Sequence, residues 1–241
     1  MPHCSARPNP NAAGAKHRLP MAGVGVWIAL MLACPTLAAP IDPAPIVAAE
    51  RAFAEEGLRF GMKQSFLDYA ALDGVVFAPD PVNARQRFGA RKDGKGDPAL
   101  VWWPLWAGIA RSGDMGFTTG PYTYGGQPGG YYFTVWKKQR DGTWKWVLDA
   151  GSDSDMTGAA QQGSTPSYLS VSTAKRSNSQ GAWRDVNQAE ARLARAAARA
   201  VVGAYLAVLA PEARVVGSHA APVDSRAGQV AELERRAYRI N

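Results

Sequence analysis

Residues 113–151, GDMGFTTGPYTYGGQPGGYYFTVWKKQRDGTWKWVLDAG, decide the fold that this sequence predicts. Segments rich in aromatic and β-branched residues alternate there with Gly, Pro and Asp, a pattern typical of strands joined by turns. The pattern predicts three successive antiparallel strands at 115–124, 131–140 and 143–150. Asp141-Gly142 between the last two is a strong short-range signal for a β-hairpin.

A two-residue turn at Asp141-Gly142 would fix which residues share a face of the sheet. It pairs Trp136 with Val147 and Thr134 with Asp149, and it places Tyr132 on their side. The other face would hold three apolar residues, Phe133, Val135 and Leu148. Because both faces are largely apolar, we expect helices to cover one of them. A second subunit or the C-terminal segment would cover the other.

The chain before this sheet predicts helices. Asp42-Pro43 is a typical helix start, and apolar residues then recur at steps of three and four. The expected face is Ile46, Ala49, Phe53, Gly57, Phe60, Gln64 and Leu67. Gly57 and Gly61 weaken its middle, so either the helix kinks or another element approaches closely. A short strand at 75–77 and a second short helix at 82–88 follow.

The first 39 residues predict a secretory signal peptide, because basic residues precede a short apolar run at 24–33 and an Ala-rich cleavage site. A retained membrane anchor is the alternative, and a lipobox at Cys34 is a weaker match. Cleavage would give a periplasmic or secreted protein with no membrane association. It would also remove both cysteines, Cys4 and Cys34, and leave His219 as the one histidine.

A mature chain of this composition excludes disulfides, cysteine nucleophiles and zinc sites built from His and Cys, so we expect no metal and no cofactor. The formal charge of the whole chain is +7, and part of it leaves with the signal peptide. Since no Lys/Arg run is interleaved with aromatic residues, we expect no nucleic-acid partner. The loop GGQPGG at 125–130 lacks the Lys-Ser/Thr of a phosphate-binding loop.

Three stretches together resemble a known superfamily: residues 131–151 (YYFTVWKKQRDGTWKWVLDAG), residues 113–124 (GDMGFTTGPYTY) and the helical stretch AAERAFAEEGLRFGMKQSFLDYAALDGVVFAPDP at 48–81. They resemble exported bacterial members of the SnoaL-like superfamily, which also contains nuclear transport factor 2 and ketosteroid isomerase. The resemblance spans about 43–151. It implies a cone-shaped α+β fold, in which a long N-terminal helix packs on a curved antiparallel sheet around a pocket. Members of this branch mostly lack an assigned activity.

Isomerase chemistry on this fold implies a tyrosine and two acids inside the pocket. The first helix offers Phe53, Phe60 and Phe66 where a hydroxyl would be wanted, and the strand at 75–77 has no carboxylate. Asp149 is therefore the candidate catalytic base, with a hydrogen-bonded structural aspartate as the alternative. We expect an aromatic-lined ligand pocket built from Trp102, Trp106, Tyr122, Tyr132, Trp136 and Asp149. Three tryptophans at 102, 103 and 106 fit core packing as well as a pocket wall.

The C-terminal part predicts a Ser/Gly-rich linker at 152–184 and a partial repeat at 185–241. Residues 189–194 match 49–54, and Val215-Val216 match Val75-Val76 at the same offset. This predicts a second copy of the helix-plus-strand half that lacks the sheet. Ala-rich helices also resemble each other without common origin. A short helical tail is expected from 229 onward.

Three functions remain open from the sequence. The first is an exported binding or accessory domain that takes a small apolar or aromatic ligand without turnover. The second is an isomerase-like or cyclase-like enzyme that uses Asp149 as base and Tyr132 or Tyr122 as hydrogen-bond donor. The third is a protein interaction module, with homodimerisation through the sheet face.

Overall fold

A computed structural model describes residues 41–77, 79–92, 96–171, 178–216 and 225–237. The described residues all belong to one compact unit. The expected signal peptide at 1–39 and His219 lie outside the described residues. No helix in the described ranges is long and apolar enough to span a membrane.

Two helices, α1 (Ala44–Phe60) and α2 (Met62–Tyr69), stand where one long helix was expected. Pro43 is the N-cap of α1, and just before it the Asp42 carboxylate accepts a hydrogen bond from the Ala44 N–H at 2.8 Å. The break falls at Gly61, whose φ of 92° is one that residues with a Cβ rarely adopt. As a result the end of α1 turns to solvent. Phe60 is 62% exposed, so its expected place on the apolar face is wrong.

Gly57 has a different use from Gly61. A Cβ at Gly57 would lie 3.1 Å from the Trp102 ring, so the glycine lets this ring pack directly against the helix. The sequence left two possibilities for the middle of the helix, a kink or a close approach by another element, and both are confirmed. The break occurs at Gly61, and the close approach occurs at Gly57.

Eight strands form one mixed sheet in the order β2-β1-β7-β6-β5-β4-β8, with β3 also paired to β5. Their bounds are β1 (Ala70–Phe77), β2 (Pro81–Asn83), β3 (Leu100–Trp102), β4 (Trp106–Ile109), β5 (Met115–Tyr124), β6 (Gln127–Lys138), β7 (Trp144–Asp153) and β8 (Ser167–Tyr168). The three central strands β5, β6 and β7 are antiparallel, as predicted. The sheet is not wholly antiparallel, because β1 pairs parallel with β7 and β8 parallel with β4. Because helices and this mixed sheet occur in one chain, the protein is of the α+β class.

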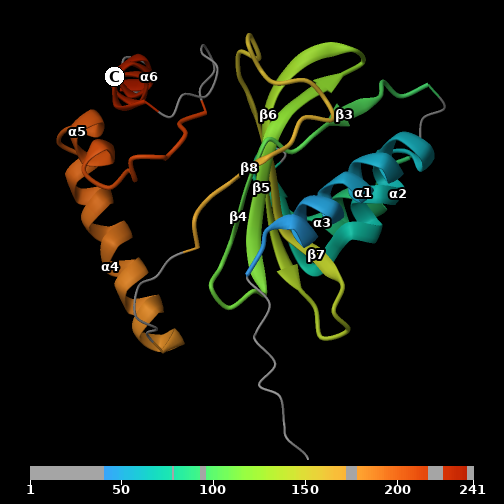
Figure 1. The fold of residues 1–241 in the computed structure, drawn as a ribbon, viewed down its shortest axis with the longest axis horizontal. Coiled ribbons are helices and arrows are strands. Elements are labelled where there is room, and N and C mark those ends of the chain that lie inside the picture. The colour runs from blue at the N-terminus through green and yellow to red at the C-terminus, as the bar shows by residue number, and fades with distance from the viewer. Residues whose placement is uncertain (1–40, 78, 93–95, 172–177, 217–224, 238–241) are drawn as a thin grey trace, which may run out of the picture. The chain divides into compact units, whose positions relative to one another are not determined.

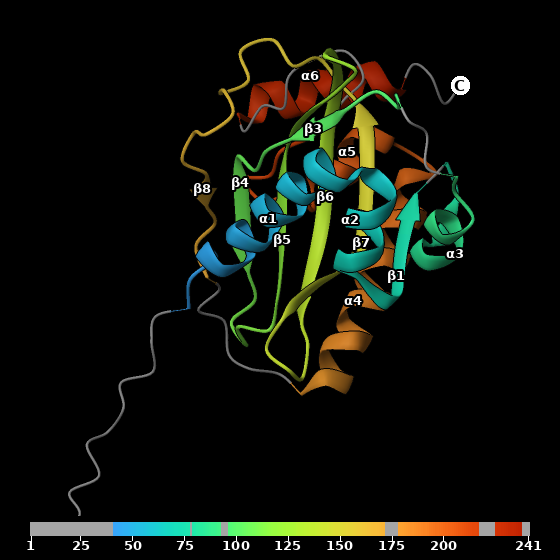
Figure 2. The same ribbon diagram turned by 90° about the vertical axis from the view of Figure 1, so that its right-hand side faces the viewer.

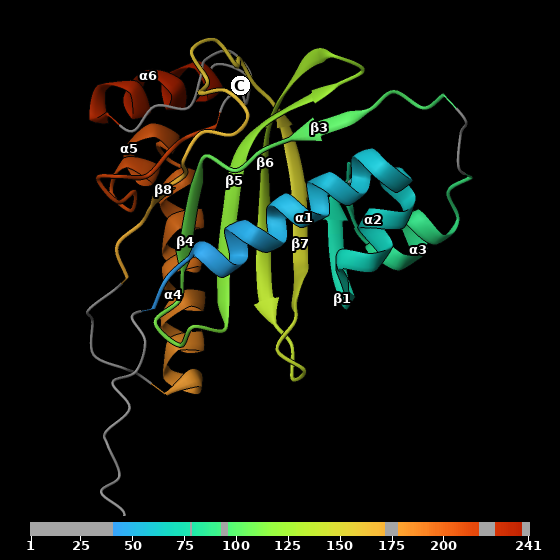
Figure 3. The same cartoon turned by 45° about the vertical axis from the view of Figure 1, so that its right-hand side comes forward.

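Helices α1 and α2 lie on one face of this sheet, and α1 crosses it obliquely (Figures 1 and 3). A third helix, α3 (Ala84–Gly89), lies next to β1 (Figure 2). Its start is capped by the Asn83 side chain, which accepts a hydrogen bond from the Gln86 N–H at 3.1 Å. This half of the molecule encloses the apolar core.

The β6–β7 hairpin is shifted by one residue from the expected register between Trp136 and the turn. Thr134 pairs with Asp149 as predicted, but Trp136 pairs with Trp146 and not with Val147. Val147 is an extra residue in β7, which makes a β-bulge. The core face of the hairpin therefore carries Trp146 in place of Val147.

Aromatic side chains fill the core between helices and sheet. The Phe53 ring lies edge-on to Phe66 and to Trp102, with ring centroids 4.8 Å apart in both pairs. Trp136 and Trp146 are completely buried beside Phe53. Such edge-to-face contacts add about 0.5–1.5 kcal/mol per pair beyond the burial of area.

The C-terminal part holds three helices, α4 (Ser179–Ala197), α5 (Val201–Leu206) and α6 (Arg226–Ala237). The segment expected as a linker, 152–184, contains the end of β7, strand β8 and the start of α4. No residue of α4 is buried, and Trp183 on it is 69% exposed. Gln229 ties α6 to the preceding loop, because its amide donates to the Ala213 carbonyl at 2.7 Å. The internal repeat stays a prediction.

Candidate functional site

A pocket of about 210 Å³ lies between the helices and the inner face of the sheet, and we call it the inner pocket. Helices α1, α2 and α3 and five strands contribute its walls. Its lining is almost entirely apolar and consists of Phe53, Met62, Phe66, Val76, Phe77, Phe88, Leu100, Trp102, Tyr122, Tyr132, Asp149, Ala150 and Gly151. Asp149 is the single carboxylate among these residues.

Asp149 is held in place by its neighbour across the hairpin. The Thr134 hydroxyl donates a hydrogen bond to its Oδ2 at 2.8 Å. No described cation forms an ion pair with it. Burial therefore raises the pKa of Asp149 to about 6, and the hydrogen bond from Thr134 opposes this only in part. A carboxylate of this kind is ionised at neutral pH and is a stronger base than an exposed aspartate.

A second acid, Glu50 of α1, is completely buried beneath the inner pocket. Its carboxylate accepts hydrogen bonds from the indole nitrogens of Trp102 at 2.6 Å and Trp136 at 3.0 Å, and from the Thr118 hydroxyl. The pKa of Glu50 is raised to about 7, mainly by burial and to a smaller extent by the charge of Asp149. The three hydrogen bonds lower it. Glu50 therefore ties α1 to β3, β5 and β6 through polar contacts inside the core.

Tyr132 lies close to both acids. Its side chain is buried, and its hydroxyl makes no hydrogen bond with a described residue. Burial raises the pKa of Tyr132 well above its ordinary value, and the charges of Glu50 and Asp149 add to this. Leaving a buried hydroxyl unpaired costs about 1–3 kcal/mol. The Tyr132 hydroxyl is thus an unpaired donor close to Thr118, buried in the wall between the two acids.

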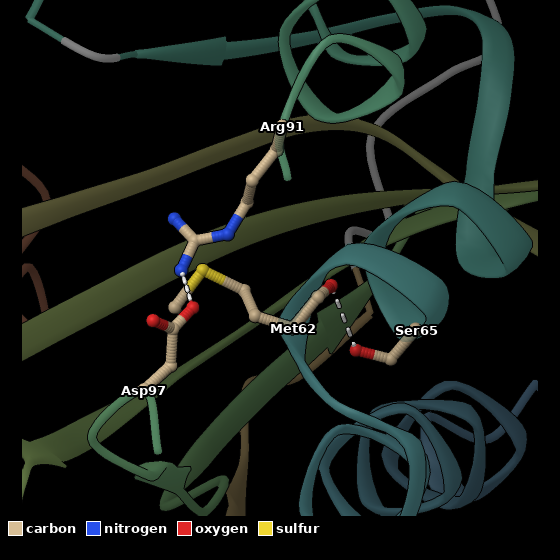
Figure 4. Close-up of polar contacts among 4 residues, drawn as sticks. All are labelled: Met62, Ser65, Arg91 and Asp97. Atoms are coloured by element: carbon tan, nitrogen blue, oxygen red, sulfur yellow. Dashed lines mark hydrogen bonds and ion pairs between the residues drawn. The ribbon is translucent and has the colours of Figure 1, made fainter. Parts of the chain in front are cut away.

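One ion pair lies in the wall of a hollow that adjoins the inner pocket. Arg91 and Asp97 bind each other beside Met62, whose side chain extends towards them (Figure 4). Met62, Leu100 and Trp102 line both the inner pocket and an adjoining hollow of about 200 Å³ near this ion pair. The carbonyl of Met62 accepts a hydrogen bond from the Ser65 hydroxyl at 3.3 Å, which fixes the start of α2.

The structure divides the six residues predicted from the sequence into three groups. Trp102, Tyr122, Tyr132 and Asp149 come together around the inner pocket. Trp136 lies in the core behind it, hydrogen-bonded to Glu50 and to Thr118. Trp106 lies on the opposite face of the sheet, where it stacks on Tyr131 with centroids 6.0 Å apart. The prediction that all six residues line one pocket is therefore wrong for Trp106, which lies on the other face of the sheet, and for Trp136, which lies behind the pocket.

Glu50 was missed by sequence reasoning, although the sequence contained a signal for it. It follows Ile46 by four residues and precedes Phe53 by three, so it lies within the apolar stripe of α1. A carboxylate on a buried helix face needs partners, and here these are side chains distant in sequence. For this reason Asp149 was the one candidate acid predicted from the sequence, and Glu50 was not considered.

The described residues include no group of three His, Cys, Asp or Glu side chains that could hold a metal ion.

Comparison with known proteins gives structural likeness alone. No protein-family model matches the sequence, and no curated protein matches it. Among solved structures, a "putative ketosteroid isomerase" from Shewanella frigidimarina NCIMB 400 is 16% identical, with a TM-score of 0.35 over 46% of this chain and 97% of that one. An NTF2-like protein of unknown function from Pseudomonas putida KT2440 is 16% identical, with a TM-score of 0.31 over 51% and 98%. A conserved protein from Planctomyces limnophilus DSM 3776 is 14% identical, with a TM-score of 0.35 over 45% and 92%.

These similarities cover about half of the present chain at low identity.

Proposed function

We propose that this protein binds a small apolar or aromatic carbonyl compound in the inner pocket and that Asp149 removes a proton next to its carbonyl group. The reaction class is proton transfer of the isomerase or cyclase kind. The observation that carries the proposal is one carboxylate, with a pKa of about 6, in the wall of an otherwise apolar pocket. Perturbed carboxylates in such surroundings are typical of acid-base sites.

The neighbouring groups fit this chemistry. Removing a proton beside a carbonyl moves negative charge onto the carbonyl oxygen, which needs a hydrogen-bond donor. The unpaired hydroxyl of Tyr132 is such a donor. Glu50 acts as a positioning residue, because its hydrogen bonds fix the Trp102 ring that forms part of the pocket wall.

Binding without turnover, in an exported accessory domain, is the alternative function. The same apolar lining supports it, since it needs no base. The two proposals differ in what Asp149 does, so a substitution there distinguishes them.

The test uses 2-tetralone, an apolar aromatic ketone whose protons beside the carbonyl exchange slowly with water. We expect the wild-type protein in D₂O to accelerate deuterium incorporation, followed by proton NMR. Asp149→Asn is expected to lower the rate by about 100-fold or more, since general bases contribute factors of this size. The wild-type rate is expected to rise with pH up to an apparent pKa of about 6 and then to level off, because Asp149 must be ionised to accept a proton.

The matched control is Asp73→Asn, which removes an exposed carboxylate from β1. It is expected to exchange deuterium at the wild-type rate. Saturation-transfer NMR would show whether Asp149→Asn still binds 2-tetralone. Binding by the wild type without faster exchange would reject the enzyme and favour the accessory domain.

We also infer export to the periplasm or secretion, on the charge and hydropathy pattern of residues 1–39. N-terminal sequencing of protein expressed with its own leader tests this, and a chain that still starts at Met1 would contradict it. Homodimerisation through the sheet is a competing proposal for the outer faces of β5 and β6, where Phe133 is 43% exposed. The light-scattering measurement given in the next subsection decides between a second copy and a small ligand on this face.

A further inference from the structure

A second pocket, of about 380 Å³, lies on the sheet face opposite to the inner pocket, and we call it the outer pocket. Its floor is formed by side chains of β4, β5 and β6. Its far wall is formed by the segment 210–216, which follows α5. The proposed function leaves this pocket unused.

The floor consists of two stacked aromatic pairs. Trp106 and Tyr131 have an interplanar angle of 24°, and Phe117 and Phe133 have one of 23° with centroids 5.3 Å apart. Strand register explains the arrangement, since Trp106, Thr119 and Phe133 form one row across the strands. The four rings make up most of the apolar floor of the pocket.

A glycine in the neighbouring row makes room for one of these rings. Gly108 on β4 pairs with Phe117, and a Cβ at this position would lie 2.6 Å from the Phe117 ring. Any larger residue would push the ring away from the strand. The flat position of Phe117 therefore depends on Gly108.

The far wall carries three small apolar side chains, Ala210, Ala213 and Val216, and two charged residues of opposite sign, Glu212 and Arg214. The Arg214 guanidinium lies 4.3 Å from the centroid of the Trp106 ring, in a cation–π contact. The hydroxyl of Thr119 in the floor is already committed, because it donates to the Tyr132 carbonyl. The pocket thus offers much ring surface and few free polar groups.

We propose that the outer pocket is a second binding site, which takes an uncharged planar molecule of two or more aromatic rings. A floor of four aromatic rings favours a ligand with aromatic rings of its own, and the opposite charges of Glu212 and Arg214 on the far wall give no preference for a charged one. A second copy of the chain is the less favoured occupant. The segment 210–216 already covers Trp106, so a partner sheet would have to displace it.

The test uses N-phenyl-1-naphthylamine, an uncharged aromatic probe whose fluorescence rises in apolar surroundings. We expect saturable binding to the full chain. Phe133→Ala, which removes a floor ring that is 43% exposed, is expected to weaken it about tenfold. Ala213→Trp is expected to fill the pocket and to weaken binding at least as much.

Two controls separate this site from others. Ala207→Trp adds the same bulk at an exposed position near the end of α5 outside the pocket lining, and Phe77→Ala removes a ring from the inner pocket. Both are expected to bind the probe with wild-type affinity. Circular dichroism would verify that all four variants keep the wild-type fold.

Three results would overturn the proposal. The first is no binding of the probe to the wild-type chain. The second is a loss of binding in Phe77→Ala with none in Ala213→Trp, which would assign the probe to the inner pocket. The third is a dimer in light scattering that Ala213→Trp dissociates, which would assign this face to a second copy.

Discussion

Trp136→Ala is expected to lower the free energy of unfolding by about 3–5 kcal/mol, the usual cost of removing a buried large aromatic ring. Trp136 is completely buried and packs edge-on against Phe53 and Tyr69. Its indole nitrogen also donates hydrogen bonds to Glu50 at 3.0 Å and to Thr118 at 2.9 Å. The substitution therefore leaves a cavity and removes a donor from a buried carboxylate. Urea unfolding, followed by circular dichroism, measures the loss.

The chain supplies its own control for this experiment. Trp183 on α4 is 69% exposed, so Trp183→Ala is expected to change the unfolding free energy by no more than about 0.5 kcal/mol. Equal losses in the two variants would show that Trp136 does not occupy the core position described for it.

The second large effect is a fall in stability as the pH rises, caused by Glu50. Its pKa is about 7 in the folded chain, against an ordinary value of 4.5. Between these two values the folded state holds a proton that the unfolded state has lost, so a higher pH favours unfolding. From pH 4.5 to pH 7 the contribution amounts to about 3 kcal/mol at most. The full penalty is present above pH 7, where Glu50 is ionised in both states.

Glu50→Gln is the variant that isolates this contribution, because glutamine keeps the size of the side chain and does not titrate. The difference in unfolding free energy between wild type and Glu50→Gln is expected to change with pH in this window. Asp149 has the same sign between 3.8 and about 6, but it is present in both proteins. Glu55→Gln, on the exposed side of α1, is expected to follow the wild-type curve. A Glu50→Gln curve parallel to the wild-type curve would contradict the assignment.

The central sheet could be predicted from the sequence because its signals are local. The turn at Asp141-Gly142 lies between two apolar strands, and its neighbours in sequence are also its neighbours in space. The strand Met115–Tyr124 is confirmed for this reason. Next to the turn the register differs by one residue from the predicted one, and the predicted pairing of Thr134 with Asp149 is found because the extra residue Val147 restores it. The parallel pair β1–β7 was not expected, since it joins strands about 70 residues apart in the sequence.

The site was harder to predict because it depends on partners far apart in sequence. Glu50 could be located on the apolar stripe of α1, but its donors Trp102 and Trp136 belong to other elements. The separation of Trp102 from Trp106 has a local cause. Between them the chain leaves β3 and enters β4, both of which pair with β5, with Pro104 in the gap. Alternation along a single strand does not apply across that gap.

The extra residue in β7 has a further consequence. Up to Trp146 the even-numbered positions of β7 face the core, whereas at Asp149 and Gly151 the odd-numbered positions face it. Trp146 and Asp149 are an odd number of residues apart, so a regular strand would send them to opposite sides of the sheet. The change of parity at Val147 is what allows one strand to give a tryptophan to the core and a carboxylate to the inner pocket.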